Sequence, residues 1–153
     1  MTNATGPRPK TPWHLWVVGL LSLIWFSGGA NDYVRTKMLD LEYLGAAANS
    51  TGVPLEMMIA YFSDWPIWAN IGWALGVWGA VAGALLLLLR SRFALHGAIA
   101  SLIGLTLSTI YTSMSAPPEF QSTVQLVFSV VIWLSVIGFA FYALRMIRAG
   151  VLR

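Results

Sequence analysis

The sequence contains no cysteine in its 153 residues. Disulfide bonds, thiolate nucleophiles and zinc or iron–sulfur sites with cysteine ligands are therefore excluded. Charged residues are also scarce, at 10% of the chain, whereas a typical soluble domain carries about 25%. Because 58% of the residues are hydrophobic and the mean hydropathy is +0.71, too little polar surface exists to cover a globule in water. We expect a lipid bilayer as the solvent.

Four apolar runs separate the few charges. A helix needs about 20 residues to cross a hydrocarbon core of about 30 Å, and these runs approach or exceed that length. None alternates with the period of two that a membrane β-barrel requires, and lipid offers no partner to an unpaired backbone group, so helices are predicted. The predicted spans are residues 14–30, 67–89, 93–114 and 124–144. The fold class is therefore all-α, a single domain over residues 1–153 with four transmembrane helices.

The loop between the first two spans, residues 31–66, is the only sizeable segment outside the predicted membrane and is expected to be partly helical. The stretch "NDYVRTKMLDLEYLGAAA" is predicted to continue the first helix, and "NSTG" to end it. A short amphipathic helix is predicted after Pro54, because proline suits a first helical turn and apolar residues recur there at helical spacing.

Most basic residues fall on one side of this path. They are Arg8, Lys10, Arg90, Arg92, Arg145, Arg148 and Arg153. The other side carries Arg35 and Lys37 together with all six acidic residues. Since short cytoplasmic flanks are enriched in lysine and arginine, both termini are predicted to face the cytoplasm.

The N-terminal segment also fits a secretory signal peptide. Arg8 and Lys10 form a basic start, an apolar stretch follows, and "SGGA" ends it with small residues. Cleavage would leave three spans and reverse the charge bias of the C-terminus, so an uncleaved first span is favoured.

The second span carries four glycines, although each glycine inside a helix costs about 1 kcal/mol relative to alanine. Their spacing returns them to one side of the helix, and the third span has small residues at the same offsets. The two sets are Gly72, Gly76, Gly79 and Gly83, and Gly97, Ser101, Gly104 and Ser108. Because the "RSR" turn makes the two spans antiparallel neighbours, we predict that the sets pack together. The alternative is a homodimer interface of the same kind.

No ionisable residue lies at mid-depth in a predicted span, which argues against a proton-coupled carrier. Four polar residues share the outer level, where they can form a cluster that binds a sugar or a cation, although caps and turns are favoured. They are Asn31, Asp32, Asp64 and Asn70. Acid, base and nucleophile do not converge at any position, so the chain is predicted not to be an enzyme, and no catalytic residue is assigned.

Two histidines begin the first and third spans, at the predicted cytoplasmic interface. His14 and His96 can in principle ligate a haem or a pigment from neighbouring helices, but an interfacial role without a ligand is favoured. No cofactor or metal is therefore assigned, with haem and pigment left open. The basic flanks are interpreted as topology signals, and no nucleic-acid partner is expected.

Two stretches, "WFSGGANDYVRT" and "DWPIWANIGWALGVWGAVAGALLLLLRSRFAL", resemble a family of small bacterial inner-membrane proteins with four spans. The family is uncharacterised and sometimes carries the label "sugar transporter". The resemblance covers the first three spans and implies a bacterial inner-membrane location. It is carried by Trp25, Gly29, Ala30, Asp32, Tyr33, Pro66, Trp68, Trp73, Ala74, Leu75, Trp78, Gly79 and the turn at residues 90–92. Where the family often has an asparagine after the first of these tryptophans, this chain has Phe26.

Two functions fit these observations. The preferred one is an accessory or assembly subunit that packs against other membrane proteins, itself or lipids. The alternative is an oligomeric carrier of a small, sugar-like solute, since four short spans enclose little space alone. A carrier should bring polar side chains from several spans together at mid-depth, whereas a subunit should be dry inside.

Overall fold

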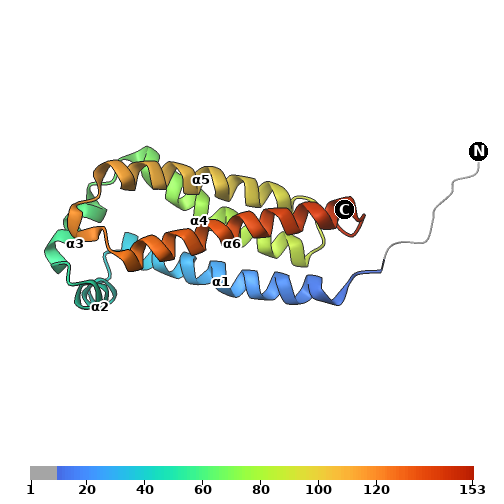
Figure 1. Ribbon diagram of the computed structural model, residues 1–153, viewed down its shortest axis with the longest axis horizontal. Coiled ribbons are helices and arrows are strands. Elements are labelled where there is room, and N and C mark those ends of the chain that lie inside the picture. Colours follow the sequence, from blue (N-terminus) through green and yellow to red (C-terminus); the bar gives the residue numbers. More distant parts are fainter. Residues whose placement is uncertain (1–9) are drawn as a thin grey trace, which may run out of the picture.

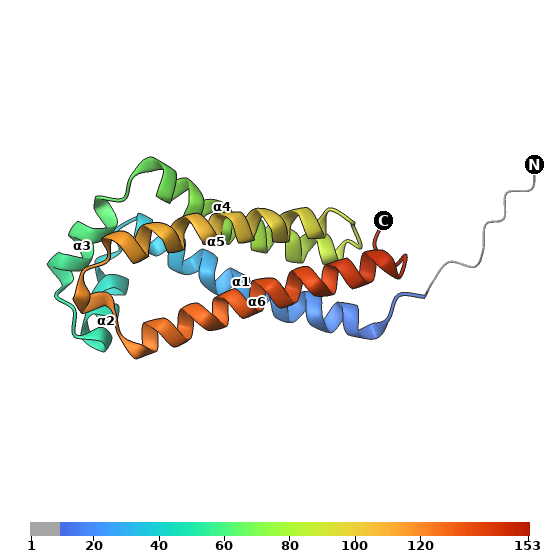
Figure 2. The ribbon, with the colours of Figure 1, turned by 45° about the horizontal axis from the view of Figure 1, so that its top comes forward.

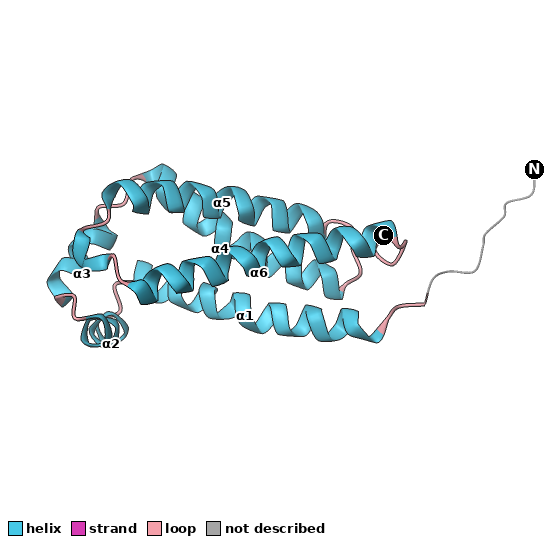
Figure 3. Cartoon of the chain, in the orientation of Figure 1, coloured by secondary structure: helices cyan, strands magenta, loops and turns pink. Residues whose placement is uncertain are grey.

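The computed structural model describes residues 10–153, and Arg8, one of the charges discussed above, lies outside the described residues. Within that range every regular element is a helix, which confirms the predicted all-α class (Figure 3). In chain order they are α1 (Trp13–Lys37), α2 (Leu41–Thr51), α3 (Leu55–Ser63), α4 (Ile67–Leu88), α5 (Ala94–Ser115), the 3-10 helix η1 (Pro118–Phe120) and α6 (Thr123–Arg148).

The helices α1, α4, α5 and α6 are each long and apolar enough to cross a membrane. They confirm the four predicted long helices and indicate a multi-pass membrane protein. All four run along the long axis of the molecule (Figure 1). The pair α4 and α5 has the most extensive contact, α1 packs mainly on α4, and α6 packs mainly on α5.

The two ends of the bundle are built differently. The short helices α2 and α3 lie with η1 at one end, which we call the cap end (Figure 1). The α4–α5 turn and residues 149–153 lie at the other end, which we call the turn end. The cap has a small core of its own, in which Ala48, Val53 and Met58 are buried and Phe120 packs against them. The cap therefore joins the α1–α4 connection to the α5–α6 connection.

The helix α1 runs to Lys37, beyond the end of the first predicted span at residue 30. The prediction that this helix continues through the following stretch is wrong, because the chain breaks at residues 38–40, where Leu39 has a left-handed φ of 51°. Asp40 then begins α2, and its carboxylate accepts hydrogen bonds from two backbone N–H groups of the first turn. An aspartate cap of this kind stabilises a helix start by about 1 kcal/mol.

The main apolar core lies in the half of the bundle nearer the turn end. Its buried side chains are Leu15, Phe26, Ala80, Ala84, Leu87, Ala94, Ala98, Val136, Phe139, Ala143, Val151 and Leu152. Phe26 of α1 meets Phe139 of α6 edge to face, with ring centroids 5.5 Å apart. All four long helices and the tail after α6 therefore share this core.

Candidate functional site

The helices α4 and α5 meet along the two predicted sets of small residues. A methyl group on Gly79 would lie 2.9 Å from the backbone nitrogen of Ser101, and one on Gly97 would lie 2.6 Å from the Cα atom facing it on α4. A methyl group on Gly104 would overlap the backbone of Gly76. The two helices thus touch backbone to backbone, which is how small residues allow dispersion to hold helices together in lipid.

We call this contact between the two sets of small residues the seam. Its two serines use their hydroxyl groups differently. Ser101 Oγ donates to the carbonyl of Gly76 at 2.6 Å, so it joins the two helices. Ser108 Oγ donates to the carbonyl of Gly104 in its own helix at 3.1 Å. Both side chains are buried. The seam therefore fixes the α4–α5 hairpin as a scaffold and presents no free group for chemistry.

The four polar residues predicted to share the outer level do not form a single cluster. Asn31 and Asp64 are exposed, and neither side chain makes a hydrogen bond within residues 10–153. Asp32 faces α2, where the Tyr43 hydroxyl donates to its Oδ1 at 2.7 Å. Burial and this carboxylate raise the pKa of Tyr43 to about 12, so its phenol stays a neutral donor at physiological pH.

Asn70 makes its hydrogen bonds at the start of α4, away from Asp32. Its Oδ1 accepts from Nζ of Lys37 at 2.7 Å, and its Nδ2 donates to the carbonyl of Trp65 at 2.8 Å. These bonds fasten the end of α1 to the start of α4. Lys37 makes no ion pair within the described residues, where the ion pair joins Arg35 to the cap of α2.

Sequence analysis did not identify the aromatic cluster that lies under the cap. Trp73 of α4 is at its centre, and the ring centroids of Tyr33 on α1 and of Trp65 each lie 5.1 Å away. Trp65 in turn reaches Tyr111 of α5 at 4.9 Å. The hydroxyl of Tyr61 and the indole N–H of Trp65 are buried without a hydrogen-bond partner in the described part of the chain. The available sequence signal is the density of aromatic residues in α3 and the first turns of α4.

The cap-end half of α6 stands away from the rest of the bundle (Figure 2). Every side chain from residue 121 to residue 128 is exposed. Val124, Leu126 and Val127 are 78%, 65% and 54% exposed, although they point to different sides of a helix with 3.6 residues per turn. A helix packed along one side would bury at least one of them. No helix therefore covers residues 123–128 of α6 on any side.

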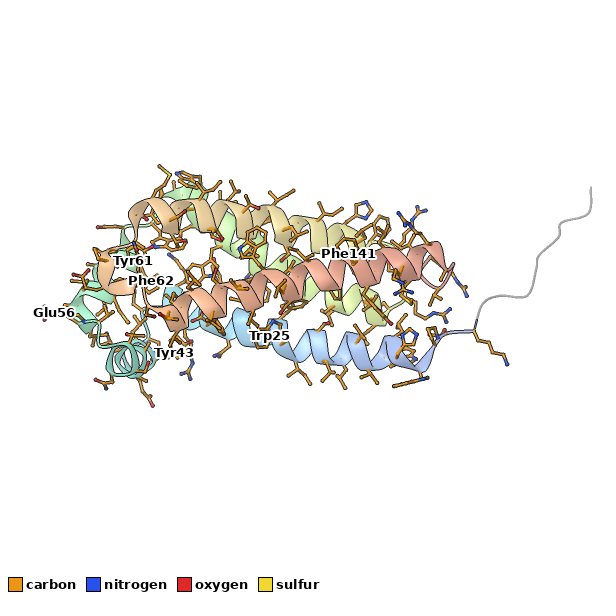
Figure 4. All side chains as sticks on the ribbon, viewed as in Figure 1. Trp25, Tyr43, Glu56, Tyr61, Phe62 and Phe141 are labelled. Atoms are coloured by element: carbon orange, nitrogen blue, oxygen red, sulfur yellow. The ribbon has the colours of Figure 1, made fainter. Side chains whose placement is uncertain are left out.

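A shallow, open apolar groove lies on one face of this half of α6, and we call it the lateral groove. It is lined by Thr123, Val124, Val127, Phe128 and Val131. Trp25, labelled in Figure 4, approaches from α1, with its ring centroid 6.3 Å from that of Phe128. The exposed wall contains no polar atom. Such a wall suits an apolar helix or a lipid chain better than a hydrophilic solute.

The side of α6 that faces the core becomes polar toward the cap end. Val136, Phe139 and Ala143 are buried on that side in the turn-end half. Helical steps of three and four residues extend the same side to Ser129 and Gln125. Gln125 is exposed because no other helix covers it. Two polar groups thus lie where the periodicity of α6 would place core residues.

At the turn end α1 and α6 are in direct contact. His14 Nδ1 and the Tyr142 hydroxyl share a hydrogen bond of 2.6 Å that joins α1 to α6, and Leu15 beside it is fully buried. His96 is exposed on α5, where its nearest aromatic neighbour is Phe93. Within residues 10–153 no group of three histidine or acidic side chains is arranged to hold a metal ion.

No protein-family model, curated protein or solved structure matches this chain. The resemblance to small four-span bacterial inner-membrane proteins therefore stays a prediction. The geometry shows that α6 is packed in its turn-end half and exposed along the lateral groove.

Proposed function

We propose that the chain is a non-enzymatic accessory or assembly subunit, and that a transmembrane helix of another membrane protein packs in the lateral groove. The observation that carries this proposal is the exposure of every residue from 123 to 128 at the cap end of α6. The other half of the same helix is packed, with Val136 and Phe139 buried. A helix that is half packed and half bare is expected where a partner completes the bundle.

Small residues on α1 favour a helix over lipid as the occupant. Gly28 and Gly29 follow Trp25 by three and four residues, so they share the side of α1 that approaches α6. A methyl group on either glycine would have no neighbour within 4 Å. Such positions allow another helix to approach closely.

We also propose that the cap end faces the periplasm of a bacterial inner membrane and the turn end the cytoplasm. The support is the distribution of charge, because Arg90, Arg92, Arg145, Arg148 and Arg153 all belong to the turn end. Reporter fusions after Arg153 test this orientation. Fluorescence from a cytoplasm-specific reporter is expected, and activity of a periplasm-specific reporter would contradict it.

Photo-cross-linking in native membranes tests the subunit proposal. Benzoylphenylalanine replaces Phe128 in the lateral groove or, as a matched control, Phe141, which is 65% exposed on the packed half of α6. We expect a discrete adduct with one membrane protein from position 128, identified by mass spectrometry, and none from position 141. Gly29→Leu should abolish the adduct by filling the space for the partner. Lipid adducts alone at position 128, or the same protein adducts at both positions, would contradict the proposal.

A second candidate function, oligomeric transport of a small sugar-like solute, is favoured by one observation. Gln125 and Ser129 lie on the side of α6 that continues its core-facing side, and the exposed Gln125 offers hydrogen bonds to a hydroxylated solute. Uptake of labelled sugar by vesicles containing only this chain would support transport. Loss of that uptake in Gln125→Leu would place the solute path beside α6, and absence of uptake would exclude transport of the sugars tested.

A further inference from the structure

The turn end carries a group of arginines with no acidic side chain nearby. Arg90 and Arg92 lie in the α4–α5 turn, and Arg153 lies in the tail after α6. All six acidic residues of the chain fall between residues 32 and 119, in segments that lead to or form the cap end. The ion pair found within residues 10–153 is also at the cap end. No acidic side chain is therefore available to neutralise these arginines.

The tail brings a third arginine to this turn. The N–H of Arg153 donates to the carbonyl of Arg90 at 2.9 Å, and the N–H of Arg92 donates to the carbonyl of Arg153 at 2.7 Å. Val151 and Leu152 are each 4% exposed and anchor the tail in the main core. Like charges held together destabilise a fold unless an anion lies close by.

Arg90 has two features that are not needed by a residue whose charge only sets the orientation of the protein in the membrane. Its φ is 58°, in the left-handed region where residues other than glycine are uncommon. Its Nε is buried without a hydrogen-bond partner in the described residues, and an unsatisfied buried donor costs about 1–3 kcal/mol. The positive-inside rule needs only a charge on this side of the membrane. A phosphate oxygen that reached Nε after a shift of the Arg90 side chain would remove this cost.

A recess of about 280 Å³ lies at this point and is lined by Leu89, Arg90, Ser91 and Arg153. The Ser91 hydroxyl accepts from the N–H of Phe93 at 3.3 Å, which leaves its own proton available for donation. Leu89 and Phe93 flank the turn and are 76% and 53% exposed. The recess thus combines donors for an anion with an apolar rim.

We propose that this recess binds the phosphate group of an anionic membrane lipid. The guanidinium groups of Arg90 and Arg153 donate to the phosphate oxygens, a contact for which the planar fork of arginine is well suited, and Ser91 adds a hydroxyl donor. The acyl chains cover Leu89 and Phe93, which a free phosphate ion would leave bare. Bound lipid neutralises the arginines and holds the tail against the turn. This site is independent of the partner helix proposed for the lateral groove.

Native mass spectrometry and thermal unfolding of the delipidated full chain test the proposal, with phosphatidylglycerol and phosphatidylcholine as probes. We expect phosphatidylglycerol to bind and to raise the melting temperature more than phosphatidylcholine does. Arg90→Gln and Arg153→Gln should each weaken phosphatidylglycerol binding about tenfold, as loss of a charge-assisted contact implies. Arg145→Gln removes the same charge from an exposed position of α6 outside the recess and should leave binding within about twofold.

Three results would overturn this assignment. Equal weakening in all three variants would show a general charge effect, and unchanged binding in Arg90→Gln and Arg153→Gln would exclude the recess. Displacement of phosphatidylglycerol by inorganic phosphate would assign the recess to the free ion instead of a lipid. If Arg90→Gln fails to fold, Arg153→Gln and Arg90→Lys decide the question, because Arg90→Lys keeps the charge and loses the forked donor and is expected to bind more weakly.

Discussion

Gly79 of α4 and Ser101 of α5 lie in backbone contact, since a methyl group on Gly79 would come within 2.9 Å of the Ser101 nitrogen. The Ser101 hydroxyl also donates to the carbonyl of Gly76 at 2.6 Å. Because this contact leaves no side chain between the two helices, the α4–α5 hairpin is the scaffold on which α1 and α6 are placed. The stability of the protein should therefore depend strongly on volume at the seam and weakly on volume at exposed positions.

Substitution of Gly97 by alanine should destabilise the protein. The added methyl group would lie 2.6 Å from the Cα of Gly83, so the helices must separate, and overpacking of this kind costs about 1–3 kcal/mol. Gly28→Ala is the matched control, because a methyl group there meets nothing within 4 Å. Thermal unfolding in detergent should show a lower melting temperature for Gly97→Ala and an equal or higher one for Gly28→Ala. Equal melting temperatures for the two variants would contradict the close backbone packing of α4 and α5 at the seam.

Substitution of Ser101 by alanine should remove the hydrogen bond between α4 and α5. The expected loss is about 1 kcal/mol of unfolding free energy, within the range for interhelical hydrogen bonds in membranes. Thr106→Ala is the control, because the Thr106 hydroxyl donates at 2.7 Å to the Leu102 carbonyl of its own helix and is exposed. Unfolding in mixed micelles should separate the two variants, and an equal loss in both would assign the effect to α5 alone.

Substitution of Tyr43 by phenylalanine should change the response of the protein to alkali. The pKa of Tyr43 is about 12 in the folded chain against an unperturbed 10.0, so the folded state holds the phenolic proton more tightly. The stability from this group is complete below the unperturbed pKa and is lost as the pH rises through the folded pKa. The difference in melting temperature between the parent chain and Tyr43→Phe should shrink from about pH 10 upward. A difference that stays constant up to about pH 11.5 would show that Tyr43 does not contribute by this route.

A double-mutant cycle at the turn end should show coupling between His14 and Tyr142. Their 2.6 Å hydrogen bond joins α1 to α6, so His14→Phe and Tyr142→Phe should each cost about 1 kcal/mol and the double variant little more than either. His96→Phe is the control, since His96 is exposed. Fully additive losses would mean that the hydrogen bond does not couple the two helices.

The four long helices could be predicted because length and apolar character are local properties of each segment. The spacing from Gly72 to Gly83 likewise identified a helix side, and the short turn identified the neighbouring helix. The end of α1 was missed because a sequence does not show how far a helix extends past the apolar region once charged residues begin. The break at Leu39 was missed for a related reason, since the cap at Asp40 competes with a continuous helix by a small free energy.

The candidate site was less predictable because it depends on packing between distant segments. Trp73 meets Tyr33 and Trp65 only after the cap folds back over the helix ends. Asp32 and Asn70 share a level in the sequence prediction, but their hydrogen bonds lead to different helices. The bare half of α6 has only a weak local signal, which is the presence of Gln125 and Ser129 on the side that is apolar and buried in the packed half.

The central claim is that the cap-end half of α6 has no packing partner in the isolated chain. Distances between α1 and α6 test this claim most directly. The chain has no cysteine, so pairs of spin labels can be introduced without first removing native cysteines. Ser27→Cys with Val131→Cys reports on the cap-end halves, and Val17→Cys with Phe141→Cys on the turn-end halves. In the purified chain in nanodiscs we expect a narrow distance distribution for the turn-end pair and a broad one for the cap-end pair, which should narrow when the complex is isolated from native membranes. Equally narrow distributions for both pairs in the purified chain would contradict the account, because α6 would then pack along its whole length without a partner.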